Sequence, residues 1–301
     1  MSVPTTRYVH RPRRGIPPGY LFVAPAVILI VLMAVYPTFR VLYLSLTDTT
    51  RLTGDLSFVG FRNYLELFRD PIFRKVVGHT LSFSLSSSLG HIVLGLLLAL
   101  AMNARLNRRF VNLCRAVILL PWAVSPIVVA MIAQLWAYPL TSPIAMTLQA
   151  LGWAGEFSPL GRPATAMWSL IVINVWQFTP FFMLMILAGL QTMNPELHEA
   201  AQVDGASPLQ RLRYLTLPHI RDILLTLSLF DLVTTAAYFD LIWVTTQGGP
   251  VRSTEVLATF TYRIGFLSMD WHRAATVGVI LLVVCVLLAA GVVAIMERGR
   301  E

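Results

Sequence analysis

The sequence predicts an all-α, polytopic membrane protein with six transmembrane helices. The first reason is composition: of 301 residues, 56% are hydrophobic and 13% are charged, and the mean hydropathy is +0.69. A soluble globular domain averages about 25% charged residues. The second reason is that the apolar residues gather into six stretches, each near the ~20 residues that a helix needs to cross the hydrocarbon core.

The predicted spans cover residues 19–46, 79–102, 113–138, 164–190, 223–246 and 274–296. Pro37 lies inside the first span and is expected to kink it, and Pro121 and Pro126 lie inside the third. Neighbouring helices can satisfy the carbonyls that a proline leaves without a partner, so the prolines are compatible with spanning helices.

The positions of the arginines predict that both termini are cytoplasmic. The N-terminal tail and the loop after the second span contain arginines and no acids, whereas the loop after the third span holds only Arg162. Cytoplasmic loops carry such an excess of basic residues. The loop 191–220 is then cytoplasmic as well. The arginines in question are Arg7, Arg11, Arg13, Arg14, Arg105, Arg108, Arg109 and Arg115.

Several function classes are excluded by what the chain lacks. Its one lysine, Lys75, has none of the glycines of a P-loop around it, so the chain does not hydrolyse ATP through that motif. The formal charge of +8 comes with no basic, aromatic-rich soluble segment, which argues against nucleic-acid binding. Cys114 and Cys285 have no metal-ligand spacing around them, and we expect neither a metal site nor a disulfide.

The polar loop 191–220 carries start and stop signals for two short helices. Asn194-Pro195 and Ser207-Pro208 each pair a good N-cap with a proline suited to the first helical turn. Asp204-Gly205 is a turn or C-cap signal between them, and Leu217-Pro218 closes the unit. The leucines fit an amphipathic pair resting on lipid. The small residues after Glu199 instead favour close approach to a protein groove, and both interpretations stay open at this point.

The same loop resembles the EAA loop of permease subunits of ATP-binding-cassette importers. That pattern reads Glu-Ala-Ala, three residues, Gly, nine residues, Ile, one residue, Leu-Pro. This chain has Glu199-Ala200-Ala201, Gly205, Leu215 and Leu217-Pro218, with leucine in place of isoleucine as the one departure. In the family this loop is a coupling helix that docks into a separate ATPase subunit, so the resemblance implies that role for these residues and for Asp204.

The resemblance extends over nearly the whole chain and favours the carbohydrate, maltose-type branch. Residues 58–80 and 119–136 match family segments, and Gly248-Gly249-Pro250 is similar to an element of the first permease of a maltose-type pair. The implied fold is that of a type I importer permease. Residues 1–78 would form the cytoplasmic tail, first span and extracytoplasmic segment. Residues 79–297 would form the five-span core with the EAA loop at 191–220.

The resemblance also implies an assembly in a bacterial inner membrane. It comprises a second permease, two ATPase subunits that hold ATP and Mg²⁺, and an extracytoplasmic protein that delivers a sugar or sugar derivative. The chain itself is expected to be no enzyme and to bind no cofactor. A runner-up function is an ion-gradient-driven secondary transporter, but Asp231 and Asp240 are few intramembrane carboxylates for ion coupling, and the two halves show no repeat.

The expected solute pathway combines aromatic rings with neutral hydrogen-bonding groups. Polar residues inside a membrane are costly and are candidates for function. The predicted residues, whose faces match the sugar-contacting faces of the maltose permease, are Asn174, Gln177, Phe178, Phe181, Phe230, Val233, Thr234 and Ala237, with Asp231 beside them. Thr234 and Ala237 stand where that permease has asparagines, so maltodextrin is not the predicted solute. The aromatics fit helix packing equally well, and Asp231 and His91 fit hydrogen bonds between helices.

Overall fold

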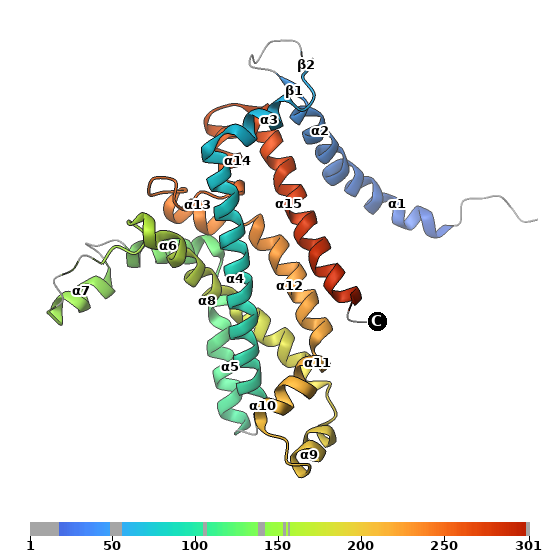
Figure 1. The fold of residues 1–301 in the computed structure, drawn as a ribbon, viewed down its shortest axis with the longest axis vertical. Helices are drawn as coiled ribbons and strands as arrows, with labels where there is room; N and C mark the ends of the chain where they lie inside the picture. The colour runs from blue at the N-terminus through green and yellow to red at the C-terminus, as the bar shows by residue number, and fades with distance from the viewer. Residues whose placement is uncertain are drawn as a thin grey trace, which may run out of the picture.

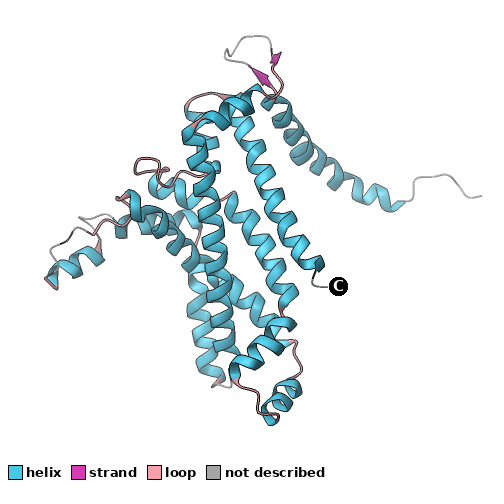
Figure 2. Ribbon diagram, in the orientation of Figure 1, coloured by secondary structure: helices cyan, strands magenta, loops and turns pink. Residues whose placement is uncertain are grey.

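The structure is a computed structural model that describes residues 18–48, 56–104, 107–137, 142–152, 155 and 157–298. Within these residues it is helical apart from one small hairpin, in which Thr47–Asp48 (β1) pairs antiparallel with Ser57–Phe58 (β2) (Figures 1 and 2). Of the arginines used to predict orientation, Arg7, Arg11, Arg13, Arg14 and Arg105 lie outside the described residues, as does the side chain of Arg108.

Five helical segments in the described residues are long and apolar enough to cross a membrane, and a bent pair makes a sixth if it counts as one span. The prediction of six spans is thereby supported, with one span that is far from straight. The five segments are Phe22–Ser45, Pro71–Asn103, Pro163–Gln191, Arg221–Thr246 and Trp271–Arg298.

The first span contains a π-helical turn where the sequence predicts a kink. It consists of α1 (Pro18–Ile30), the π turn Val31–Val35 and α2 (Tyr36–Ser45). The backbone N–H of Tyr36 bonds to the carbonyl of Val31, five residues back. Pro37 has no N–H and its ring crowds the preceding turn, so a wider turn there relieves the clash.

The second span starts earlier than predicted. After α3 (Arg62–Arg69), helix α4 runs without interruption from Pro71 to Asn103. The carboxylate of Asp70 accepts a bond from the N–H of Ile72 at 2.8 Å, which makes Asp70-Pro71 a regular capped start. The predicted domain boundary between residues 78 and 79 therefore falls inside a continuous helix.

The third predicted span, 113–138, is bent by 91° between two helices. These are α5 (Arg108–Ala123) and α6 (Pro126–Ala137), followed by the short α7 (Pro143–Ala150). The prediction of one continuous helix was wrong here. Pro126 pushes Ser125 out of the helical region, and Pro121 removes a further backbone donor nearby.

The remaining helices complete the bundle and the loop at its end. The fourth span is α8 (Pro163–Gln191); the loop holds α9 (Pro195–Val203), α10 (Pro208–Arg211), a π turn (Leu212–Thr216) and α11 (Leu217–His219). The fifth span divides into α12 (Arg221–Ala236) and α13 (Asp240–Thr246). The chain ends with α14 (Leu257–Tyr262), the π turn Arg263–Leu267 and α15 (Trp271–Arg298).

The core of the bundle lies along the contact between α4 and α8. A Cβ atom added at Gly90 would lie 2.6 Å from Val175, and one added at Gly95 would lie 2.8 Å from the Cβ of Phe182. Small residues at such positions let helix backbones approach closely in membrane proteins. Buried residues of α12 join the lower part of this core, where Leu227 packs with Leu187.

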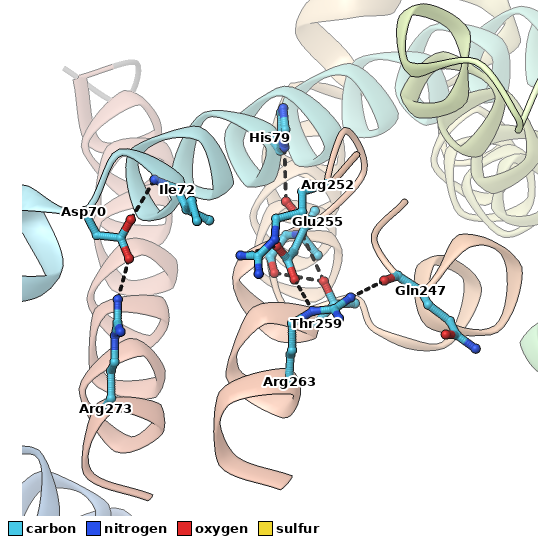
Figure 3. Close-up of polar contacts among 10 residues, drawn as sticks. Asp70, Ile72, His79, Gln247, Arg252, Glu255, Thr259, Arg263 and Arg273 are labelled. Carbon is cyan, nitrogen blue, oxygen red and sulfur yellow. Dashed lines mark hydrogen bonds and ion pairs between the residues drawn. The ribbon is translucent and has the colours of Figure 1, made fainter. Parts of the chain in front are cut away.

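The first span is tied to the last at the upper end of the bundle in Figure 1. The hydroxyl of Thr47 lies 3.1 Å from Nδ1 of His272, the hydroxyl of Ser45 lies 2.7 Å from that of Tyr64, and Asp70 pairs with Arg273 (Figure 3). The hairpin and α3 therefore close over the ends of α4 and α15, at the opposite end from α9.

Candidate functional site

The first helix of the loop 191–220 is closed at both ends by its own residues. The side chain of Asn194 accepts from the N–H of Glu196 at 3.1 Å. At the other end, the N–H of Ala206 bonds to the carbonyl of Ala201 and that of Gly205 to the carbonyl of Gln202, which is a Schellman ending. Gly205 has φ +77°, the left-handed conformation that such an ending requires. The predicted cap and turn are confirmed.

The second helix starts with a reciprocal capping box and is longer than a single turn. The N–H of Ser207 donates to Oε1 of Gln210 at 2.7 Å, and the N–H of Gln210 donates to the Ser207 hydroxyl at 3.3 Å. Helical turns then continue to His219, with the π turn placed before Pro218. The same accommodation of a proline by a wide turn precedes Pro37.

The two helices expose most of the residues predicted to couple to a partner. All nine residues of α9 are described and none is buried. Glu199, Ala200, Asp204, Gly205 and Pro218 are exposed, and Ala201, Leu215 and Leu217 are partly buried. A shallow hollow of about 410 Å³ lies between the helices, lined by Ala201, Asp204, Gly205, Ala206, Gln210, Arg211, Tyr214 and Leu215.

Two apolar side chains at the rim of the loop 191–220 are largely exposed. Val203 is 88% exposed and Leu209 is 73% exposed. The loop projects from the lower end of the bundle in Figure 1 rather than lying along its side. Exposed apolar side chains in this position are compatible with a protein partner and with lipid, the two interpretations that the sequence leaves open.

The loop contacts two of the long helices, and one of these bonds to a third. The hydroxyl of Thr192 at the end of α8 lies 3.0 Å from Nε2 of His219, and the guanidinium of Arg221 at the start of α12 donates to the carbonyl of Ile295 in α15. Ile220 is fully buried, in a cluster with Leu187 and Leu190 of α8. The loop is therefore packed against α8 and the start of α12, and α12 is bonded in turn to α15.

The predicted pathway residues divide into an exposed group and a buried group. On α12, Phe230, Thr234 and Ala237 are exposed along one face, and Val233 is partly buried. On α8, Phe178 and Phe181 are partly buried, and the ring of Phe181 lies 6.0 Å from that of Phe230. We call Phe230 and Thr234 of α12, with Ala237 directly after its last residue, the α12 face, and Phe181 of α8 lies at its edge.

Asn174 and Gln177 lie behind that face and not on it. Asn174 is 0% exposed and Gln177 is 1% exposed. The amide of Gln177 donates to the carbonyl of Val124 at 3.2 Å, at the bend between α5 and α6. Gln177 thus satisfies a carbonyl that the broken helix leaves without its usual partner. Sequence periodicity placed Asn174 on one helical face with Phe178 and Phe181, and Gln177 was a candidate as a polar group inside the membrane. Neither observation distinguishes a pathway from an interhelical contact.

Asp231 is buried against α4. Its Oδ2 atom lies 2.9 Å from Nδ1 of His91, and both residues are nearly inaccessible. The structure therefore favours the hydrogen bond between helices, one of the two roles that the sequence left open for Asp231, and it confirms the interhelical contact expected for His91. Asp231 is not part of the α12 face.

The Gly248-Gly249-Pro250 segment forms a tightly held loop that the sequence did not predict. It folds around Glu255, which is 0% exposed (Figure 3). Oε1 of Glu255 lies 2.6 Å from Nε of Arg263, and its backbone carbonyl lies 3.2 Å from Nδ1 of His79 on α4. Gly248, at φ +83°, leaves only 3.1 Å between an added Cβ and Glu255. The sequence around Glu255, with Arg252 three residues before it, gave no sign of this burial.

The described residues hold no group of histidine, cysteine, aspartate or glutamate side chains that could bind a metal ion. What they do hold is a bundle of helices long and apolar enough to cross a membrane, an exposed loop packed against two of them, and an exposed face of mixed aromatic and hydroxyl character on α12. Such an arrangement fits the class of membrane permease subunits.

The chain belongs to the family of binding-protein-dependent transport system inner membrane components, whose family model matches residues 91–301. It is 34% identical to the trehalose/maltose transport system permease protein MalF of Thermococcus litoralis, over 82% of this chain and 84% of the relative. It is 33% identical to the lactose transport system permease protein LacF of Rhizobium radiobacter, over 89% of this chain and 91% of the relative.

The fold is also that of a solved importer. A bacterial alginate ABC transporter, solved in complex with an alginate pentasaccharide-bound periplasmic protein, contains a chain with a TM-score of 0.83 to this one. The two are 23% identical, and the match covers 94% of each chain. The type I importer permease fold and the permease function expected from the sequence are both confirmed, and the secondary-transporter alternative is set aside.

Proposed function

We propose that this chain forms half of the translocation pathway for a sugar or sugar-like solute. Its partners would be a second permease, an extracytoplasmic binding protein that delivers the solute, and two ATPase subunits that hold ATP and Mg²⁺. Family membership and the sugar-transporting relatives support the solute class. The observation that carries the coupling part of the proposal is the exposed, self-capped loop 191–220, joined by contacts to α8 and α12, the second of which bonds to α15.

In this proposal Glu199, Ala200, Ala201, Asp204, Gly205, Leu215, Leu217 and Pro218 couple the chain to an ATPase subunit. Closure of the ATPase dimer on ATP moves the loop, and the packed contacts at Ile220 carry this motion into α8 and α12. The loop and both termini are cytoplasmic, in a bacterial inner membrane. The five-span core, expected at 79–297, begins at Pro71 because α4 does.

The solute contacts proposed for this subunit are those of the α12 face, with Phe178, Phe181 and Val233 at its edge. Exposed aromatic rings next to a hydroxyl suit the apolar faces and hydroxyl groups of a sugar ring. Asn174, Gln177 and Asp231 support this face from behind through their buried positions.

Reversing the charge of Glu199 is expected to reduce uptake strongly. We expect Glu199→Lys to lower ATP-dependent uptake about tenfold, because a cation would meet the partner surface that the acid suits. Uptake of a panel of labelled sugars into cells that lack the native permease measures this and names the solute. Glu297→Lys, an equally exposed reversal in the last turn of α15, is the control and should transport normally. Normal uptake by Glu199→Lys in a correctly inserted chain would contradict the coupling proposal.

Truncating Phe230 is expected to weaken the solute contact without disturbing coupling. Phe230 is 54% exposed, so Phe230→Ala removes an accessible ring and opens little internal space. Loss of a stacking contact of about 1 kcal/mol predicts roughly a fivefold fall in uptake. Phe230→Trp, which keeps an aromatic surface, should retain most of the rate. Trp176→Ala on α8, exposed to a similar 56%, is the control for loss of an aromatic side chain.

A further inference from the structure

One buried histidine binds two different helices at the centre of the bundle. His91 of α4 is 0% exposed. Its Nδ1 atom lies 2.9 Å from Oδ2 of Asp231 on α12, and its Nε2 atom lies 3.2 Å from the backbone carbonyl oxygen of Asn174 on α8. A single imidazole ring thus holds α4, α8 and α12 together.

The two contacts fix how many protons this group contains. A backbone carbonyl only accepts, so Nε2 must carry the hydrogen that it donates to Asn174. A second proton lies between Nδ1 and Asp231, because two facing lone pairs would otherwise repel beside an uncompensated buried negative charge. That proton is on the ring, giving an imidazolium–carboxylate pair, or on the carboxyl group, giving a neutral pair. In both cases the net charge of the pair is zero.

The surroundings leave the ring little freedom to move. Its plane stacks on Phe182, with centroids 5.0 Å apart and 9° between the planes, and Phe178 presents its edge at 6.0 Å. Gly90 and Gly95, where α4 and α8 come closest, flank His91 on α4. Because this packing fixes the ring, its two hydrogen bonds hold Asp231 and the carbonyl of Asn174 in one orientation.

The pair lies at the level of the α12 face, three turns along α12 from the loop. Asp231 is about 15 Å from Arg221, where α12 leaves the loop, at 1.5 Å of rise per residue. Asp231 and Thr235 are buried one turn apart, whereas Phe230 and Thr234, each one residue earlier, are exposed. A bond at Asp231 consequently sets which way Phe230 and Thr234 point, because adjacent residues lie 100° apart around a helix.

We infer that His91 and Asp231 are positioning residues for transport. Their net-neutral pair is a fixed pivot on α12, and motion of the loop turns the α12 face about this pivot. The inference rests on the proposed function and adds a coupling role that the exposed residues alone do not provide.

Replacement of Asp231 by asparagine is the conservative test. An asparagine amide can donate to Nδ1 of a neutral His91 while Nε2–H stays on Asn174, so the three helices remain joined with zero net charge. In vesicles that contain the permease pair and its ATPase subunits, Asp231→Asn should retain ATP hydrolysis stimulated by the binding protein within about twofold. Loss of that stimulation in an assembled Asp231→Asn complex would overturn the inference.

The double variant His91→Phe/Asp231→Leu separates positioning from stability. A buried polar pair can often be replaced by apolar side chains of similar volume without loss of stability. We expect this complex to assemble with an unchanged melting temperature and to lose stimulated hydrolysis about tenfold or more, the scale of an ordinary allosteric coupling. An assembled double variant with wild-type stimulation would overturn the inference. If the double variant does not assemble, the Asp231→Asn complex tests the inference.

A direct readout follows the rotation of α12 itself. In a Cys114→Ser/Cys285→Ser background, Thr234→Cys should change its rate of labelling by a water-soluble maleimide when ATP and vanadate are added. The change should persist with Asp231→Asn and vanish in the double variant. Nucleotide-dependent labelling in the double variant would contradict the positioning role. By contrast, a wild-type complex with no stimulated hydrolysis at all would count against the proposed function and leave the structure of the pair unaffected.

Discussion

Gly205→Val is expected to reduce uptake by roughly thirtyfold or more, since a branched residue in the left-handed region costs about 2 kcal/mol. Gly205 has φ +77° and closes α9 through the bond from the next N–H, on Ala206, to the carbonyl of Ala201. Nothing lies within 4 Å of an added Cβ, so the effect acts through the backbone and not through a clash. The second helix would then leave the turn in another direction and present a different surface to the ATPase.

Other substitutions at Gly205 should give graded effects, and Gly152 provides a matched control in the same chain. Gly205→Asn should retain more uptake than Gly205→Ala, because asparagine tolerates the left-handed region better than other residues do. Gly152 also has a positive φ, +84°, and open space around it, but lies after α7. Gly152→Val should leave stimulated ATP hydrolysis intact. Equal losses at both glycines would point to general backbone destabilisation and against a specific role for the loop.

Gly95→Val is expected to prevent a stable bundle from forming. A Cβ at this position would lie 2.8 Å from the Cβ of Phe182 and 3.2 Å from the backbone nitrogen of Met183, and a backbone atom cannot move aside as a flexible side chain can. Overpacking of a close-packed interior costs about 1–3 kcal/mol, and more where a backbone must shift. The displaced α8 would also pull the carbonyl of Asn174 away from His91. The yield of folded complex in detergent and its melting temperature measure this effect.

Gly78 provides the control for Gly95 because it lies on the same helix. No atom lies within 4 Å of a Cβ added there. Gly78→Val should therefore yield normal amounts of complex, and its melting temperature should stay close to that of the wild type. If Gly95→Val were as well tolerated as Gly78→Val, α4 and α8 would have to be packed less closely than the structure has them.

The sequence predicts local structure correctly where the signal lies within a few neighbouring residues. Asn194-Pro195, Gly205 and Ser207-Pro208 are cap and turn residues whose action is confined to a few neighbours, and each forms the predicted structure. Long apolar runs located the spans for the same reason. Asp70-Pro71 is an equally good start signal, but hydrophobicity alone does not reveal it because the residues that follow it, up to Lys75, are partly charged.

Tertiary contacts were beyond the reach of such signals. The 91° bend of the third span depends on what packs around Pro126, and its free carbonyl is satisfied by Gln177 from a helix far along the chain. Likewise, the sequence made Asn174 and Phe230 equal candidates for the solute pathway, yet Asn174 is fully buried and Phe230 is 54% exposed. A polar residue in a membrane helix is expected to face away from lipid. Whether it then lines a pathway or bonds to another helix depends on the helices that pack around it.

The caps of the loop 191–220 have a bearing on the energetics of assembly. Because Asn194 and Gly205 cap both ends of α9, and Ser207 and Gln210 cap the start of the next helix, the proposed contact with an ATPase subunit would use helix ends that are already satisfied within the chain. Binding then immobilises few backbone torsions, and little of the interaction energy is spent on ordering. Subunits can accordingly associate as preformed bodies, and a modest contact area suffices to hold them through repeated cycles of nucleotide exchange.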